Sequence, residues 1–305
     1  RRSSSAASDV YKRQVKHRLT CLMDLGLGYL SLMRSSPTLS GGESQRIALS
    51  TCVGSALVGS TYVLDEPSIG LHPEDTQRLI SVLERLRNQG NTVVVVEHDD
   101  DIVTAADFVV DMGPQAGSFG GEVVFSGPQD GLSQCDDTHP SLTAAYRNGH
   151  MAIPIPEQRR TSQDKLSMRN VYTHNLRGFD VDVPLRSLVA VSGVSGSGKS
   201  TLITQLLVPA VQAQLDGFGG QTKGFEALEG DLGTLEHLEF VDQNPIGKSS
   251  RSNPVTYVKA FDEIRTLLAE SAHAKARGLK PSHFSFNISG GRCETVSYTH
   301  LTLPT

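Results

Sequence analysis

The sequence predicts an α/β fold built around a parallel sheet. Two short apolar segments, 61–65 and 92–96, are rich in β-branched residues, and the periodic apolar residues of 74–88 predict a helix between them. This strand–helix–strand order is typical of parallel sheets, whose strands need crossover connections. A glycine-rich loop at 193–200, between an apolar segment and a helical pattern, is a third sign of this architecture.

Composition leaves the class of function open. The 305 residues suggest about two domains at roughly 150 residues each, and 29 glycines with 14 prolines stay far below a disordered composition, so the chain buries a core. A net charge of −5 excludes a globally basic nucleic-acid binder but leaves room for a local basic face. Four scattered cysteines fit a reducing compartment, and no apolar run reaches membrane-spanning length, so we expect a cytoplasmic protein without a membrane contact.

The first half of the chain contains a regular series of elements. The unbroken valine run at 92–96 predicts a strand that is covered on both faces. The other predicted elements are a helix over 15–33, a glycine-rich loop at 39–46 that opens a helix, a strand at 61–65, helices over 74–88 and 99–106, a strand at 108–110 and a hairpin at 120–127.

Residues 130–164 are polar and proline-containing, which predicts a linker between two modules. The second module begins near Leu166, and its stretch 217–233 is poorly patterned. Its predicted elements are strands at 179–183, 188–191 and 238–242, a helix from about Thr201, and a helix over 255–269.

Residues 193–200 match the phosphate-binding pattern G-x-x-x-x-G-K-[ST] in full. The glycines let consecutive N–H groups face a phosphate, and the following helix N-terminus adds positive charge. A chance glycine- and serine-rich loop is the alternative, which the flanking strand and helix patterns disfavour. We therefore predict ATP and Mg²⁺ as ligands, with Lys199 on the β- and γ-phosphates and Ser200 on Mg²⁺. The candidate nucleotide-binding residues are Gly193, Ser195, Gly196, Ser197, Gly198, Lys199, Ser200 and Thr201.

A second candidate site follows the strand at 61–65. Asp65 could hold Mg²⁺ through water, and Glu66 could polarise an attacking water. Acids after strands are often only loop residues, and a single histidine such as His98 is more often packed than catalytic. The neighbouring motifs favour a catalytic role for Asp65 and Glu66, because Ser40-Gly41-Gly42 opens a helix upstream and His98 ends the valine run downstream.

Taken together, LSGGESQR, LDEP, SIGLH and VVVVEH resemble the nucleotide-binding domain of the ATP-binding cassette (ABC) family, a P-loop NTPase fold. The resemblance implies that Ser40, Gly41 and Gly42 form the signature loop and that Asp65 is the Mg²⁺-associated acid. It further implies Glu66 as general base, 68–72 as the loop that crosses to the opposite cassette, and His98 as the switch histidine. Gln243 matches the glutamine that contacts Mg²⁺ and the attacking water.

The order of these motifs is unusual, because a single cassette begins with the phosphate loop. The chain therefore resembles two partial cassettes joined by a linker. Residues 15–129 match the C-terminal half of a first cassette, and 165–294 match the N-terminal part of a second. We call these the first and second modules.

Within tandem cassettes, the stretches DEPSIGLH, VDQNPIGKSSRSNPVTY and FSFNISGGRCE are closely similar to the UvrA family, over about residues 15–294. The resemblance implies the damage-recognition ATPase of bacterial nucleotide excision repair. Its implied partners are damaged double-stranded DNA, a second copy of the protein and the B component of the excinuclease.

In cassette proteins, ATP lies between the phosphate loop of one domain and the signature of the other. The Lys199 loop and the Ser40–Gly42 signature are thus expected to form one composite site. Asp65 and Glu66 would serve another site, whose phosphate loop would precede residue 1, and the second module's own signature and acids would follow residue 305. We therefore expect weak ATP binding and poor hydrolysis by this chain alone.

The family resemblance also suggests residues that contact DNA and a cysteine that belongs to a zinc module. Lys248 and Arg251 lie in a polar loop and are candidate contacts to DNA phosphates, with solvated surface charges as the alternative. In the family, GGRCE begins a four-cysteine zinc module. Here Cys293 lacks the second cysteine of a CxxC pair, and structural zinc needs four ligands, so we expect no zinc binding by Cys293 alone.

Both termini differ in character from the rest of the chain. Residues 1–14 and 295–305 resemble non-native tails of translated fragments, with terminal disorder as the alternative.

Two other classes of function remain beside the repair ATPase. They are a UvrA-like ATPase of an export or drug-resistance system and a non-catalytic nucleotide-binding adaptor.

Overall fold

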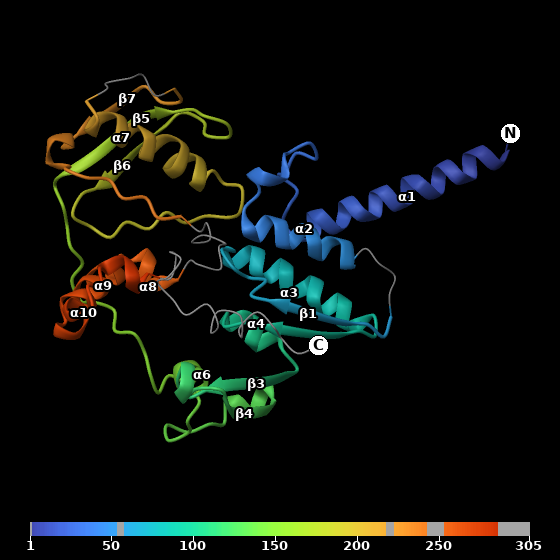
Figure 1. Ribbon diagram of the computed structural model, residues 1–305. Helices are drawn as coiled ribbons and strands as arrows, with labels where there is room; N and C mark the ends of the chain where they lie inside the picture. Colours follow the sequence, from blue (N-terminus) through green and yellow to red (C-terminus); the bar gives the residue numbers. More distant parts are fainter. Residues whose placement is uncertain (1, 54–57, 218–222, 243–252, 286–305) are drawn as a thin grey trace. The chain divides into compact units, whose positions relative to one another are not determined.

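The computed structural model describes residues 2–53, 58–217, 223–242 and 253–285. The chain divides into two compact units, 1–238 and 239–305, which we describe separately. The helices and strands of unit 1 up to residue 128 are α1 (Arg2–Asp24), η1 (Ser36–Thr38), α2 (Gly41–Val53), β1 (Thr61–Asp65), α3 (Pro73–Asn88), β2 (Thr92–Val96), α4 (Asp100–Ala105), β3 (Phe108–Gly113), η2 (Gly117–Phe119) and β4 (Glu122–Pro128) (Figure 1).

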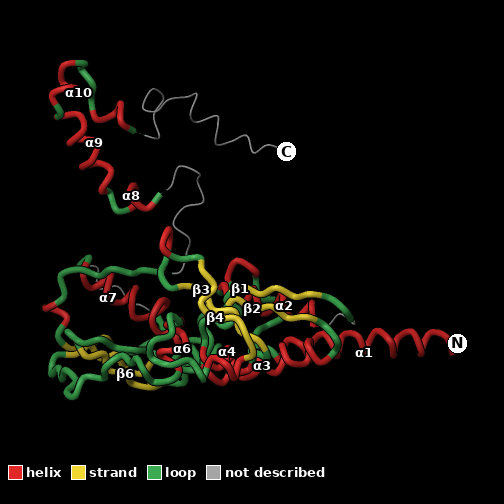
Figure 2. Tube along the Cα trace, turned by 90° about the horizontal axis from the view of Figure 1, so that it is seen from below, coloured by secondary structure: helices red, strands yellow, loops and turns green. Residues whose placement is uncertain are grey.

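The core of the first module lies on one face of a parallel pair of strands. β1 and β2 pair in parallel from Thr61 opposite Thr92 to Asp65 opposite Val96, so both strands end at the same edge (Figure 2). The amphipathic helix α3 supplies the largest share of this core, including Leu79 and Leu86, which are almost fully buried. The predicted strands and the helix between them are therefore present. The buried cluster consists of Cys21, Leu25, Leu49, Val53, Leu79, Ile80, Val82, Leu83, Leu86 and Ile102.

The valine run of β2 is covered on one face only, contrary to the expectation of coverage on both. Val93 and Val95 pack against the helical core, whereas Val94 and Val96 are 45% and 55% exposed. On β1, Val63 is 70% exposed for the same reason. The side chains of a strand alternate between faces, and within the described residues the core cluster packs against the inward set alone.

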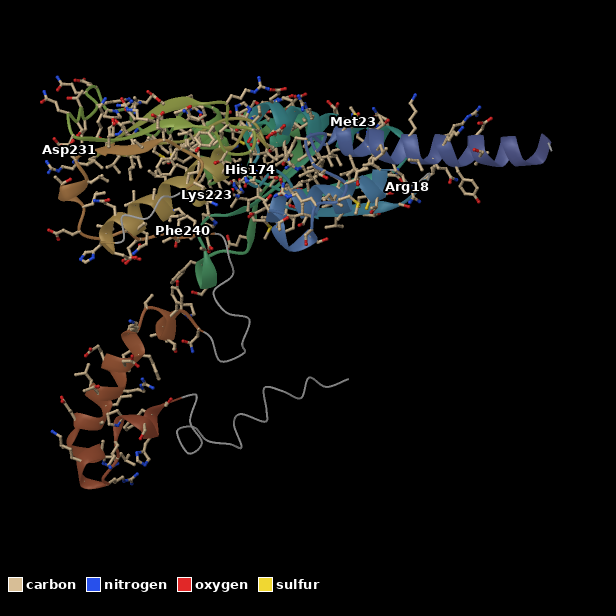
Figure 3. All side chains as sticks on the ribbon, turned by 90° about the horizontal axis from the view of Figure 1, so that it is seen from above. Arg18, Met23, His174, Lys223, Asp231 and Phe240 are labelled. Atoms are coloured by element: carbon tan, nitrogen blue, oxygen red, sulfur yellow. The ribbon has the colours of Figure 1, made fainter. Side chains whose placement is uncertain are left out.

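The first helix differs from its predicted bounds at both ends. α1 ends at Asp24 rather than Met33, because Gly26 adopts a left-handed conformation (φ 72°) that stops the helix. It also includes residues 2–14, which the sequence assigned to a non-native tail. Every residue from Ser8 to Thr20 is exposed, and so is Met23, labelled with Arg18 in Figure 3.

The segment expected to be a linker begins with ordered structure. β3 and β4 pair with each other as an antiparallel hairpin. The hairpin expected within 120–127 alone is wrong, because residues 122–128 form a single strand whose hydrogen-bonded neighbour is β3. α5 (Gln129–Leu132) and α6 (Leu142–Arg147) follow β4. The buried Ser141 donates its hydroxyl to Asp111 of β3 (2.5 Å), which ties α6 to the hairpin. The linker thus starts later than residue 130, and residues 152–156 have no regular structure.

The second module contributes an antiparallel sheet of order β6-β5-β7 to unit 1. Met168 and Val171 of β5 are fully buried beneath the helix that follows the glycine-rich loop. Its elements are β5 (Lys165–Val171), β6 (Phe179–Pro184), the π-helical stretch η3 (Thr201–Leu207), α7 (Val208–Leu215), β7 (Ala227–Gly230) and η4 (Leu232–Thr234).

Two predicted strands of the second module are absent. Residues 188–191 and 238–242 form no strand, and Leu188 is fully exposed. A strand requires a hydrogen-bonded neighbour, and none of the described strands pairs with either segment. The β-branched residues of 188–191 therefore extend into the loop without sheet pairing.

Unit 2 is a small helical segment in its described part. The helix predicted over 255–269 is broken into α8 (Pro254–Tyr257) and α9 (Ala260–Glu270), because Lys259 adopts a left-handed conformation (φ 59°). α10 (Ala272–Ala276) and η5 (Pro281–Phe284) follow. In the part of the chain that the structure describes, no helix combines the length and apolar character that a membrane span requires.

Candidate nucleotide-binding site

The loop at 193–200 has the curled backbone that a phosphate-binding loop needs. Gly193, Gly196 and Gly198 have φ angles of 144°, 76° and 106°, which side-chain-bearing residues rarely adopt. The chain becomes helical at Lys199, and Leu202 donates its N–H to the carbonyl of Gly198 (2.9 Å). The predicted helix therefore follows the loop, with its N-terminal N–H groups at the place where a phosphate would bind.

Lys199 folds back over its own loop. Its Nζ donates to the carbonyl oxygens of Gly193 (2.6 Å) and Val194 (3.0 Å). The ammonium group is thereby held above the curled backbone beside the first turn of the helix, where Ser200 and Thr201 lie. Glycine N–H groups, an ammonium group and a hydroxyl together form a donor set that fits a triphosphate with Mg²⁺.

The loop contacts two buried charged residues from the first module. The N–H of Ser195 donates to Oδ2 of Asp75 (3.0 Å), and Nη1 of Arg46 donates to the Ser195 hydroxyl (3.4 Å). Asp75 and Arg46 are each only 4% exposed. Burial alone would raise the pKa of Asp75, but hydrogen bonds from Ser195 and the charges of Arg46 and Arg78 lower it below its usual value.

Sequence reasoning did not identify Asp75 or Arg46 as site residues. Asp75 lies in the first turn of α3, where an acidic residue is ordinary because it complements the helix dipole. Arg46 follows the signature in α2, but its spacing from the glycines gives no sign that its side chain reaches the distant loop. Only the folded chain brings them to Ser195, which lies more than a hundred residues away.

An aromatic ring from the first module also covers the loop. A Cβ at Gly196 would lie 2.6 Å from ring atoms of Tyr29, so the Tyr29 ring lies directly on the glycine. From the second module's own side, Nδ2 of Asn175 donates to the Gly196 carbonyl (3.0 Å). Gly196 is thus enclosed from two sides, and no larger residue fits there without displacing Tyr29.

The signature segment begins α2 with a reciprocal cap. The N–H of Glu43 donates to the Ser40 hydroxyl (3.2 Å), and the N–H of Ser40 donates to Oε2 of Glu43 (2.8 Å). The S-x-x-E spacing is the sequence signal for this cap. Gly41 has open space around its Cα, and Gly42 lies close to the carbonyl of Ile69, so the first turn presents bare backbone. Burial alone would raise the pKa of Glu43, but bonds from Tyr29 and Ser40 and the charge of Arg34 lower it.

The acids Asp65 and Glu66 lie at the shared edge where β1 and β2 end. The carbonyl of Asp65 accepts a bond from Gln45 of α2 (2.7 Å), and the N–H of Glu66 donates to the carbonyl of Val96 (2.9 Å). Glu66 has a left-handed backbone (φ 44°), a strained conformation of the kind that collects at functional sites. The exposed His98 follows β2, so the parallel pairing of β1 and β2 places Asp65, Glu66 and His98 along the same edge of the sheet.

Glu97 is a further residue at this edge that the sequence did not single out. Its Oε1 accepts the N–H of Ser68 (2.7 Å), and its Oε2 accepts the N–H of His98 (3.1 Å). Burial alone would raise its pKa, but these bonds lower it. Glu97 therefore ties the loop after Asp65 and Glu66 to the end of β2.

Four predicted site residues lie outside the described residues: Gln243, Lys248, Arg251 and Cys293. Among the residues that are described, no group of three or more His, Cys, Asp or Glu side chains could hold a metal ion. Cys21, Cys52 and Cys135 are not in disulfides.

The site and fold agree with comparisons to known proteins. The crystal structure of UvrA2 from Deinococcus radiodurans superposes with a TM-score of 0.81 at 47% identity, covering 92% of this chain and 33% of that chain. UvrABC system protein A from Mycobacterium tuberculosis is 50% identical over 298 residues, which is 97% of this chain. Over nearly its whole length, this chain matches a segment of the UvrA family. UvrABC system protein A from Thermus thermophilus is 49% identical over 302 residues, which is 96% of this chain.

The UvrA-type segment spans about 30% of the length of the curated relatives it matches. No family model matches it. The expected α/β fold of the P-loop type is confirmed by the superposition on UvrA2. The relatives' names do not favour the export alternative.

Proposed function

We propose that this segment forms part of the ATP-dependent damage-recognition subunit of the bacterial excision-repair system. The names of the relatives, UvrABC system protein A, support this role. In this proposal the protein acts in the cytoplasm on damaged double-stranded DNA, as a homodimer, and passes the DNA to the B component of the excinuclease. The full family protein would carry zinc, whereas Cys293 supplies one ligand of the four that a structural site needs.

One observation carries the proposed ATP site. The Ser195 backbone and side chain contact Asp75 and Arg46, which come from the module that carries the signature. The loop at 193–200, which matches the phosphate-binding pattern, therefore packs against the first module, whose signature is expected to form the other side of the ATP site. We propose that the Lys199 loop and the segment Ser40–Gly42 enclose one ATP molecule between them.

Each residue of this composite site has a proposed role. The N–H groups of the loop and Lys199 would hold the phosphates, and Ser200 would ligate Mg²⁺. Thr201 would contribute to the N-terminal end of the helix, whose N–H groups face the phosphates. Mg²⁺ neutralises charge that develops on the phosphate oxygens during transfer. Gln243 would orient the attacking water, and the bare backbone of Gly41 and Gly42 would face the γ-phosphate.

Asp65, Glu66 and His98 are proposed to serve a different ATP molecule. If so, the Lys199 site has no general base in this chain, and such a base contributes about 10²–10⁴-fold to rate. We expect the isolated chain to hydrolyse ATP at least about 100-fold more slowly than a full-length UvrA protein, as measured by phosphate release. Steady turnover that Lys199→Ala abolishes and Glu66→Gln spares would contradict this assignment.

The DNA role gives a separate prediction. In a full-length UvrA protein that carries this segment, Lys248→Ala combined with Arg251→Ala should weaken DNA binding. The slope of log K against log salt should fall by about 0.9 for each DNA phosphate that the variant no longer neutralises. Fluorescence anisotropy across a salt series measures both quantities, with the exposed Lys223→Ala as the control. An unchanged affinity and slope would mean that the two residues are solvated surface charges.

A further inference from the structure

We infer that Tyr29 is a positioning residue that links the phosphate loop to the signature helix. The inference rests on the proposed composite ATP site and goes beyond it, because Tyr29 belongs to neither motif. The Tyr29 side chain contacts both the phosphate loop and α2. Its ring lies on Gly196 of the loop, and its hydroxyl donates to Oε1 of Glu43 in α2 (2.6 Å).

The contact with Gly196 fixes the position of the loop backbone. The ring atoms Cγ, Cδ1 and Cδ2 of Tyr29 lie within 2.8 Å of where a Cβ of residue 196 would be. Gly196 also has a left-handed φ of 76°, so this glycine is required both by the ring and by the backbone. Any displacement of the loop at Gly196 toward the first module must therefore move the ring of Tyr29.

The hydroxyl end of Tyr29 acts on the signature through the helix cap. Glu43 is 7% exposed and also accepts the N–H of Ser40, the first signature residue, through Oε2 (2.8 Å). Arg34 approaches the same carboxylate at 3.4 Å and donates to the carbonyl of Thr38 (2.7 Å). Hydrogen bonds to a charged acceptor are stronger than neutral ones, so Tyr29 is held firmly at this end.

The two contacts form a continuous path from the loop to the signature. It runs from Gly196 through the Tyr29 ring and hydroxyl to Glu43 and the N–H of Ser40. The two ends of the side chain therefore have separable effects. The ring should set how well the loop is ordered for nucleotide, and the hydroxyl should set how the signature turn is placed for turnover.

The test compares Tyr29→Phe and Tyr29→Ala in a full-length UvrA protein that carries this segment. Tyr29→Phe keeps the ring and loses the bond to Glu43, so we expect the nucleotide Kd to stay within about twofold while kcat falls about tenfold. Tyr29→Ala removes both contacts and should also weaken nucleotide binding about tenfold. Calorimetry gives Kd, and amide hydrogen exchange at 195–197 in the nucleotide-free protein should be faster in Tyr29→Ala and unchanged in Tyr29→Phe.

Two controls make the outcomes distinct. Tyr146→Phe removes a hydroxyl from the half-exposed Tyr146 of α6 and should change nothing. Lys199→Ala should weaken nucleotide binding at this site by about 10- to 100-fold. If both Tyr29 variants match Tyr146→Phe while Lys199→Ala loses binding, the role of Tyr29 is wrong and the composite site stands. If Lys199→Ala binds nucleotide normally, the proposed ATP site itself has failed. Equal losses of kcat and affinity in both Tyr29 variants would indicate general destabilisation and overturn the inference.

Discussion

Replacing Asp75 with alanine is expected to lower the free energy of unfolding of unit 1 by about 3 kcal/mol. The Asp75 carboxylate accepts the N–H of Ser195, and its charge faces the buried Arg46. Nε of Arg46 already has no hydrogen-bond partner among the described residues. Removal of the acid would leave a loop N–H without its acceptor, take away a negative charge close to the buried guanidinium of Arg46, and break the ion pair with Arg78 (3.9 Å). Urea unfolding of the chain measures the loss.

Asp107→Ala is the matched control for this prediction. Asp107 also pairs with an arginine, since both of its carboxylate oxygens contact Nη1 of Arg87 at 2.9–3.0 Å, but the Asp107 side chain is 73% exposed. Exposed pairs contribute about 0–1 kcal/mol, so this variant should unfold nearly as the wild type does. Asp75→Asn should fall between the two, because an amide oxygen still accepts the Ser195 N–H. Equal losses for Asp75→Ala and Asp107→Ala would contradict the importance of the buried contact.

Replacing Lys199 with alanine is expected to weaken ATP binding by about 10- to 100-fold. The ammonium group would contact two phosphates through charge-assisted bonds, and alanine supplies neither charge nor donor. Calorimetric titration of the chain with Mg-ATP measures the change. Lys199→Arg should recover little affinity, because a planar guanidinium does not fit a site shaped around a point charge.

Lys223→Ala is the control for Lys199→Ala, since Lys223 is exposed and lies outside the loop (Figure 3). It removes the same charge from the same unit and should leave the ATP affinity unchanged. A similar loss of affinity in both variants would mean that net charge, and not the loop, determines binding.

Local pattern was enough to predict the strand–helix–strand unit of the first module. The apolar periodicity of α3 and the β-branched runs of β1 and β2 each matched the structure, because those elements bury one regular face within the described chain. The same pattern failed at residues 188–191, where β-branched residues are present but no described strand pairs with them. β-Propensity describes a fit to a neighbouring strand, and sequence alone does not supply the neighbour.

The candidate site likewise contains residues that local sequence could predict and residues that it could not. The loop glycines, Lys199 and the Ser40–Glu43 cap could be predicted, because each depends on residues close in sequence. Tyr29, Arg46 and Asp75 could not, because they reach Ser195 and Gly196 only through the packing of the two modules. Their side chains have ordinary local explanations in a helix or turn, so no spacing rule distinguishes them.

The central claim is that the Lys199 loop and the Ser40–Gly42 signature enclose the same ATP molecule. An ATP analogue with a photoreactive group on its γ-phosphate tests this directly in a full-length UvrA protein that carries this segment. Peptide mapping after irradiation should find label on both 193–201 and 40–46, and at an analogue concentration near the wild-type Kd Lys199→Ala should strongly reduce both. Label on 193–201 alone, or label on 40–46 that persists in Lys199→Ala, would contradict the composite site.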